Sequence, residues 1–468
     1  MAEQQEYDVI VVGGGSTGEN AAWYARENGL SAVVVESELI GGECSYWACM
    51  PSKALLRPGE ALAAARRVPA AQPAVTGAVD VEAALRSRDG FASGWNDESQ
   101  VQWLAGIDVD VVRGHGRLAG ERAVEVQTED GPPVTLTARK AVVVATGSRA
   151  AVPPIEGLRD ITIWDNRDAT AAKQIPARLL VLGGGVVGSE MAQAYRRLGA
   201  QEVTIVEMAD RLLPAEEPFV GAELGEAFEA EGIRVLTGAK VTRAVRELSD
   251  GPVTLVLHDG TGVVGDELLV AVGRQPRTDD IGLETVGLDP GGYLEVDDRL
   301  RVRGVDGGWL YAAGDVNGRA LLTHQGKYQA RLVGDIIAGR DQQAWADHKA
   351  LPRVTFTDPQ IAAVGSTEQQ ARDAGLQVKT VRYDIGATAG GALAGKGVKG
   401  TTQFVIDQDR RVIAGATFVG PGVGEMLHAA TIAIVGEVPL DRLWHAVPAF
   451  PTISEVWLRL LEADRGNS

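Results

Sequence analysis

The sequence predicts an α/β protein in which two repeated strand, glycine-turn and helix motifs precede a C-terminal domain of the α+β type. Three observations lead to this prediction. A β-rich run followed directly by a Gly-x-Gly-x-x-Gly turn and a helical stretch occurs twice. The next strand of each motif ends in an acid. After residue 350 the pattern changes to short alternating strands with helices between them, as in α+β domains.

The first motif begins with a strand predicted for residues 7–12. The turn at residues 13–18 follows at once and opens a helix that ends near residue 28, and a second buried strand covers residues 32–35. This is the dinucleotide-binding pattern, with one glycine for the tight turn, one for the approach of pyrophosphate, one for helix packing and an acid for a ribose hydroxyl. These positions are Gly13, Gly15, Gly18 and Glu36.

The second motif repeats this order, with predicted strands at residues 179–182 and 203–206. Its corresponding positions are Gly183, Gly185, Gly188 and Glu207. An acid at the end of the second strand favours a free 2′-hydroxyl, because it repels a 2′-phosphate. The second site is therefore predicted to prefer NADH over NADPH.

Both cysteines of the chain, Cys44 and Cys49, lie in the stretch at residues 41–53, just upstream of Lys53. On an ideal helix, residues five apart lie about 8 to 9 Å apart at Cα, whereas a disulfide needs roughly 4.4 to 6.8 Å. A bond between them requires an irregular backbone, for which Pro51 supplies a cause. We therefore expect Cys44 in or just before a distorted first turn and a regular helix after Pro51.

The cysteines alone leave two interpretations open, a pair of buried structural thiols and a redox pair. A helix N-terminus with a nearby lysine raises thiolate character, which favours the redox pair. No metal site is expected, because no further cysteine completes a zinc ligand set and the six histidines are scattered.

Composition excludes several classes of partner. The 468 residues carry 45 Lys and Arg against 63 Asp and Glu, a net charge of −18, so nucleic acid is not an expected partner. The first six residues are acidic and polar, unlike a secretory signal, and no apolar run reaches the roughly 18 residues that a membrane span needs. Two cysteines in so long a chain fit a reducing cytosol, and we expect a cytoplasmic protein.

The motif G-G-x-C-x4-C-x-P-x-K at residues 41–53 resembles the redox-active signature of the class I pyridine nucleotide-disulfide oxidoreductases, which include lipoamide dehydrogenase, glutathione reductase and mercuric reductase. The resemblance spans nearly the whole chain. Besides both glycine turns, it is carried by the segments at residues 144–147, 272–276, 313–315, 356–359 and 451–455.

The resemblance implies an FAD-dependent enzyme that takes hydride from NADH or NADPH and forms a homodimer. It divides the chain into an FAD-binding domain at 1–150, an NAD-binding domain at 151–275, a central domain at 276–348 that completes the FAD site, and a dimerisation domain at 349–468.

By the same resemblance, Lys53 would lie beside flavin N5 and pair with Glu190, because a cation there favours the negatively charged reduced flavin. Cys49 would be the thiol against the flavin, and Cys44 the interchange thiol that faces the substrate. Further FAD contacts are implied for Gly42, Lys53, Gly116, Thr146, Gly147, Asp315 and Thr323. Further NAD contacts are implied for Val241 and Gly273.

The chain departs from the family in its C-terminal motif. Disulfide-reducing members carry a histidine directly before the Pro-Thr pair and a glutamate that orients it, whereas this chain has Phe450 and keeps Glu455. A thiol with a pKa of about 8.5 is only about 3% thiolate at pH 7, and a positioned acid or base contributes roughly 10² to 10⁴ in rate.

Three interpretations follow from the missing histidine. The first is a dihydrolipoamide dehydrogenase-like disulfide oxidoreductase with an unusual substrate or another proton carrier, such as His445. The second is a reductase that passes electrons from the flavin to quinones, dyes, oxygen or a metal ion. Mercury is disfavoured, because the tail lacks the cysteine pair of mercuric reductases. The third is a flavin redox sensor or binding protein.

Aromatic residues replace the small or amide residues usual between the cysteines. Tyr46 and Trp47, together with Phe450, are predicted to form an aromatic wall around the disulfide. This arrangement predicts a flat or apolar disulfide or other small-molecule substrate.

Overall fold

The computed structural model describes residues 4–128, 131–248 and 251–466. The chain divides into two compact units. Unit 1 comprises Met1–Pro51, Asp89–Ala150 and Arg274–His348, and unit 2 comprises Ser52–Arg88, Ala151–Gly273 and Lys349–Ser468. Within the described residues, no helix is long and apolar enough to cross a bilayer.

Unit 1 is built on a seven-stranded sheet in the order β3-β2-β1-β6-β5-β4, with β16 also paired to β6. The strands next to the glycine turn are parallel and rich in Val and Ile, and both of their faces are buried, as expected for parallel strands covered on two sides. The strands are β1 (Gln4–Val12), β2 (Ala32–Glu36), β3 (Val109–Arg113), β4 (His115–Leu118), β5 (Ala123–Gln127), β6 (Val134–Val144) and β16 (Leu310–Ala312). The strands predicted from residues 7–12 and 32–35 are confirmed.

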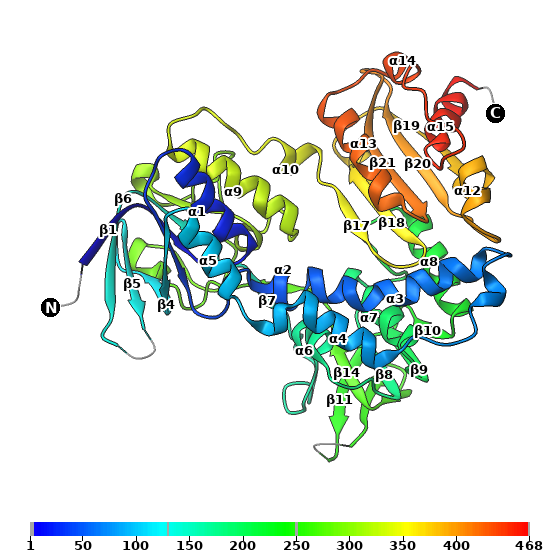
Figure 1. The fold of residues 1–468 in the computed structure, drawn as a ribbon, viewed down its shortest axis with the longest axis horizontal. Coiled ribbons are helices and arrows are strands. Elements are labelled where there is room, and N and C mark those ends of the chain that lie inside the picture. The colour runs from blue at the N-terminus through cyan, green and yellow to red at the C-terminus, as the bar shows by residue number, and fades with distance from the viewer. Residues whose placement is uncertain (1–3, 129–130, 249–250, 467–468) are drawn as a thin grey trace. The chain divides into compact units, whose positions relative to one another are not determined.

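Helices α1 (Ser16–Glu27) and α9 (Thr323–Ile337) lie side by side in unit 1 (Figure 1). Their contact is close, because a Cβ atom added at Gly326 would lie 2.2 Å from Thr17 Oγ1. The other unit 1 elements are α2 (Gly42–Tyr46), α5 (Glu98–Gly106) and the two-stranded ladder of β7 (Ser148–Ala150) and β15 (Arg274–Pro276).

The second nucleotide-binding motif lies in unit 2 and forms a four-stranded parallel sheet in the order β10-β9-β8-β14. A three-stranded antiparallel sheet, β11-β12-β13, follows in the same segment of the chain. The strands are β8 (Arg178–Leu182), β9 (Glu202–Val206), β10 (Ile233–Leu236), β11 (Val241–Arg246), β12 (Val253–Leu257), β13 (Gly262–Gly265) and β14 (Glu267–Val270). The helices are α6 (Asn166–Ala171), α7 (Val186–Arg197) and α8 (Pro218–Ala230).

The C-terminal part of unit 2 is a five-stranded antiparallel sheet in the order β17-β18-β21-β20-β19, with α13 packed against β18 and β21 (Figure 1). It has the mixed α+β character that the sequence predicts. Its strands are β17 (Arg353–Thr355), β18 (Gln360–Gly365), β19 (Val378–Asp384), β20 (Thr401–Asp407) and β21 (Val412–Gly420). Its helices are α11 (Glu368–Asp373), α12 (Ala389–Ala394), α13 (Val423–Val435), α14 (Leu440–Leu443) and α15 (Glu455–Arg465).

The described residues also form the α-helices α3 (Cys49–Arg67), α4 (Val81–Phe91) and α10 (Ala346–Lys349).

Candidate active site

The two cysteines lie on successive helices. Cys44 is on the five-residue helix α2, and α3 begins at Cys49. Trp47 separates them with φ −138° and ψ 2°, which is the predicted break in the backbone. The expectation of a regular helix only after Pro51 is wrong. Proline is tolerated in the first turn of a helix, where its missing N–H would have no intrahelical acceptor.

No disulfide joins Cys44 and Cys49 in the structure. A hydrogen bond with Cys49 and burial raise the pKa of the Cys44 thiol well above its usual range. Cys49 Sγ lies 3.2 Å from Thr323 Oγ1, at the start of α9. The predicted positions Cys44, Cys49 and Thr323 are therefore brought together within unit 1.

Lys53 and Glu190 form an ion pair in unit 2, with 2.7 Å between Nζ and Oε2. Glu190 lies on α7 and is buried, whereas Lys53 is one-third exposed. Phe356 holds both partners, because its backbone N–H donates to Glu190 Oε1 at 2.9 Å and its ring centroid lies 4.9 Å from Lys53 Nζ. Sequence reasoning had placed Phe356 in a motif without assigning it this contact.

The first glycine turn has the shape that a dinucleotide requires. Gly13 has φ +99°, and a Cβ atom at Gly18 would lie 1.8 Å from Gly13 O, so α1 packs directly on the turn. At Gly15 an added Cβ would meet only Gly42 Cα, at 3.9 Å, which leaves room for a pyrophosphate. Glu36 accepts the N–H groups of residues 14 and 38, both at 2.6 Å.

Apart from Lys53, the other predicted FAD positions also lie in unit 1. Gly42 has φ +58° and Gly147 has φ +71°, and Gly116 packs so closely on β2 that a Cβ would lie 2.8 Å from Val35. Thr146 donates its hydroxyl to the carbonyl oxygen of Arg277 at 2.8 Å.

Asp315 follows β16 and lies partly buried next to Ser148. Burial raises the pKa of the Asp315 carboxyl, although the hydrogen bond from Ser148 and the charge of Arg274 oppose this shift. A partly buried acceptor just after a strand fits a hydroxyl-rich ligand such as the ribityl chain of FAD.

The second turn in unit 2 repeats the first. Gly183 has φ +105°, and a Cβ at Gly188 would lie 2.0 Å from Gly183 O. At Gly185 an added Cβ would meet nothing within 4 Å. Glu207 accepts the N–H groups of residues 184 and 209, at 2.6 and 2.7 Å. Of the remaining predicted NAD positions, Val241 opens β11 and Gly273 has φ +139°.

The C-terminal motif is arranged around local contacts. Glu455 accepts the N–H of Ala389 at 3.1 Å and an Arg459 N–H at 2.7 Å, and these bonds lower the pKa of its carboxyl. Phe450 and His445 are exposed. The prediction of an aromatic wall is wrong for Tyr46, which is fully buried and donates its hydroxyl to the carbonyl of Ile40 at 3.0 Å.

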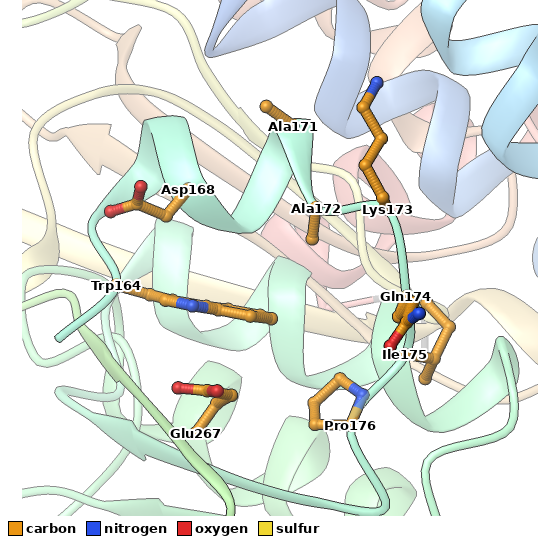
Figure 2. Close-up of a pocket in the computed structure, with 9 residues that line it drawn as sticks. All are labelled: Trp164, Asp168, Ala171, Ala172, Lys173, Gln174, Ile175, Pro176 and Glu267. Atoms are coloured by element: carbon orange, nitrogen blue, oxygen red, sulfur yellow. The ribbon is translucent and has the colours of Figure 1, made fainter. Parts of the chain in front are cut away.

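A separate pocket of about 500 Å³ lies in unit 2, lined by parts of the segment 164–176 and by Glu267. In the view of Figure 2 the carboxylates of Asp168 and Glu267 flank the ring of Trp164, and Lys173 points away. Glu267 already pairs with Arg246 at 2.9 Å. None of the predicted site residues lines this pocket.

Family models match both parts of the chain. The model described as pyridine nucleotide-disulphide oxidoreductase matches residues 7–330, and the dimerisation domain of the same family matches residues 351–460. The chain belongs to the pyridine nucleotide-disulphide oxidoreductase family. Family members use FAD, a nicotinamide nucleotide and a disulfide redox centre, and so does this flavoprotein oxidoreductase.

Curated relatives fall in two groups of the family. Dihydrolipoyl dehydrogenase from Thermus scotoductus is 33% identical, over 98% of this chain and 97% of the relative. Mercuric reductase from Streptomyces lividans is 34% identical, over 94% of this chain and 93% of the relative.

Solved structures share the fold at lower identity. The HOCl-induced flavoprotein disulfide reductase RclA from Escherichia coli, as its Cu(II) complex, has a TM-score of 0.85 at 23% identity, covering 98% of this chain and 99% of that one. LpdA from Mycobacterium tuberculosis has a TM-score of 0.85 at 24% identity, with the same coverage.

Proposed function

We propose that this chain is an NADH-dependent disulfide oxidoreductase that reduces a disulfide substrate of apolar or otherwise unusual structure. The observation that carries the proposal is the cysteine pair. Its two thiols are hydrogen-bonded to each other, and Cys49 also contacts Thr323, within the unit that holds the first dinucleotide fingerprint. The dimerisation domain supports a homodimer.

In this proposal, separate sets of residues bind the two cofactors. The first glycine turn, Glu36 and Asp315 hold FAD, and the second turn and Glu207 hold NADH. Bound FAD supplies two-electron transfer between NADH and the cysteine disulfide. Lys53, held by Glu190 and Phe356, keeps a positive charge in place for the flavin.

The two cysteines then carry the electrons to the substrate. The Cys44 thiolate attacks one sulfur of the substrate disulfide, whose S–S bond breaks, and the leaving thiolate takes up a proton. Cys49 next attacks the Cys44 sulfur, releases the second substrate thiolate and restores the Cys44–Cys49 disulfide.

A screen of disulfides with the purified enzyme and NADH tests this proposal. Lipoamide, glutathione disulfide and aromatic disulfides are compared, and aromatic disulfides are expected to give the highest kcat/KM. The proposal is wrong if no disulfide is turned over, and its specificity is wrong if lipoamide or glutathione disulfide alone is efficient.

A second candidate is a reductase that passes electrons from the flavin to quinones, dyes or metal ions. Phe450 in place of the histidine favours it, because such acceptors need no proton from a histidine. Cys44→Ser separates the two candidates. It is expected to abolish disulfide reduction, and if quinone turnover stays near the wild-type rate while no disulfide is reduced in the wild type, the second function holds.

A further inference from the structure

Glu19 and Lys327 lie on two neighbouring helices of unit 1, α1 and α9. Helices α1 and α9 run parallel, since Gly326 packs on Thr17 and, two turns later, Gly334 packs on Tyr24. Glu19 follows Thr17 by two residues, and Lys327 follows Gly326 directly. Both side chains are partly buried, and Figure 1 shows the two helices side by side.

Lys327 is also tied to the cysteines through its own helix. It lies four residues after Thr323, and residues four apart share one face of a helix. Thr323 contacts Cys49 at 3.2 Å, so Lys327 stands one turn further along that face. The hydrogen bond with Cys49 and burial raise the pKa of the Cys44 thiol. The hydrogen bond with Thr323 and the charge of Lys327 act in the opposite direction and lower it.

We propose that Lys327 and Glu19 together replace the histidine that the C-terminal motif lacks, Lys327 by stabilising the Cys44 thiolate and Glu19 by supplying the proton that the leaving thiol needs. This inference rests on the proposed disulfide reductase function and deepens it.

The surroundings of Glu19 suit a proton carrier. Burial raises the pKa of its carboxyl to about 7, although Lys327 opposes the shift from α9. The Glu19 charge also acts on Tyr46 of α2, whose pKa is raised to about 12, first by burial, so that Tyr46 stays neutral. Glu19 is therefore present in both protonation states near neutral pH, which general acid catalysis requires.

The exchange step balances with these groups. The Cys44 thiolate forms a bond to one substrate sulfur, the substrate S–S bond breaks, and the pair of electrons leaves on the second sulfur. The proton of the Glu19 carboxyl moves to that thiolate, and water restores the proton to Glu19 after release.

The role of Lys327 is tested by alkylation, without any acceptor. In the holoenzyme with Cys49→Ser, Cys44 is the sole cysteine, and its reaction with iodoacetamide across pH reports its thiolate. Lys327→Met is expected to slow alkylation at pH 7 by about tenfold, because an opposite charge nearby shifts a pKa by one unit or more.

Two further variants control this assay. Lys327→Arg is expected to retain the wild-type profile, since it keeps the charge. Arg331→Met, one turn further along α9 and exposed, is expected to have no effect. An unchanged profile for Lys327→Met, or an equal loss in Lys327→Arg, would overturn the role of Lys327.

The role of Glu19 is tested with two disulfides in the enzyme with both cysteines. Glu19→Gln is expected to slow reduction of 2-hydroxyethyl disulfide at least tenfold, because an alkyl thiolate must be protonated as it leaves. Reduction of 5,5′-dithiobis(2-nitrobenzoate) is expected to change less than about twofold, because its leaving thiolate is stable without a proton.

An equal change for both disulfides would overturn the proton role of Glu19. If the wild type reduced neither disulfide, the proposed function would fail, while the alkylation assay would still decide on Lys327.

Discussion

Glu190 illustrates how much the candidate site depends on single side chains. Its carboxylate accepts from Lys53 and from the N–H of Phe356, and the side chain is only 3% exposed. Glu190→Gln leaves Lys53 without its charge partner, and hydrogen bonds to charged groups contribute about 1.5 to 3 kcal/mol. We expect stopped-flow reduction of the flavin by NADH to slow about tenfold or more.

Glu60→Gln is the matched control for this substitution. Glu60 lies on the same helix as Lys53 and forms an ion pair with Arg57, whose side chain is 68% exposed. Its loss is expected to leave the rate of flavin reduction unchanged, because exposed pairs contribute little. Equal rates of flavin reduction in Glu190→Gln and Glu60→Gln would show that Glu190 does not contribute to this step.

At the scale of elements, the glycine turns offer a test that separates binding from folding. Gly185 has φ −75°, and an added Cβ would meet no protein atom within 4 Å, so Gly185→Ala is expected to fold normally. The methyl group would instead meet the pyrophosphate. We expect the KM for NADH to rise at least tenfold with an unchanged thermal midpoint.

Gly225→Ala provides the comparison for this turn. Gly225 lies inside α8, where an added Cβ likewise meets nothing within 4 Å. We expect a slightly higher thermal midpoint, because alanine favours a helix, and an unchanged KM. A KM for Gly185→Ala equal to the wild-type value would show that no nucleotide approaches this turn.

The elements also show what sequence can predict. The buried strands and glycine turns were predicted because their signals are local: runs of Val and Ile, fixed glycine spacings and an acid at the strand end. The start of α3 at Cys49 was not predicted, because Pro51 was expected to interrupt the helix, whereas it lies in the first turn, where proline is tolerated. Glu19 and Lys327 were not predicted, because only the packing of α1 against α9 relates them in space. No local sequence pattern indicates that packing. A charged residue directly after a glycine turn was the one available signal.

At the scale of the whole molecule, a partly buried ion-pair network connects three segments of unit 2. Asp358 accepts from Arg67 at 2.8 Å and from Arg197 at 2.9 Å, and Arg197 also binds Glu231. Burial alone would raise the pKa of the Asp358 carboxyl, but the hydrogen bond from Arg67 and the charges of both arginines outweigh it, so the pKa is lowered.

A lowered carboxyl pKa contributes stability above the unfolded value of about 3.9, and this contribution is lost as the pH falls through the folded value. Asp358→Asn is therefore expected to lower the thermal midpoint by several degrees at pH 7 and to converge with the wild type below about pH 4. The exposed Asp210 forms an ion pair with Arg211, and Asp210→Asn is expected to change neither the thermal midpoint at pH 7 nor its dependence on pH. A constant difference at all pH values would contradict this account.

The exposed face of helix α13 offers a test of the homodimer that we propose. Helix α13 of the dimerisation domain buries one face on β18 and β21 and exposes Ile432 (58%) and Val435 (49%). Ile432→Asp together with Val435→Asp is expected to shift sedimentation from dimer to monomer. Leu248→Asp, equally exposed outside this domain, is expected to remain dimeric.

Both oxygens of Glu207 are already committed to the backbone, one to the N–H of Gly184 and one to that of Ala209. The carboxylate thus holds the loop in place, in addition to the contact with the ribose that we propose for it. Protein engineers who wish to convert this enzyme to the phosphorylated coenzyme face a redesign problem, since Glu207→Arg would strip two amides of their acceptor. A successful change of coenzyme therefore requires replacement of the neighbouring loop as well as introduction of the arginine.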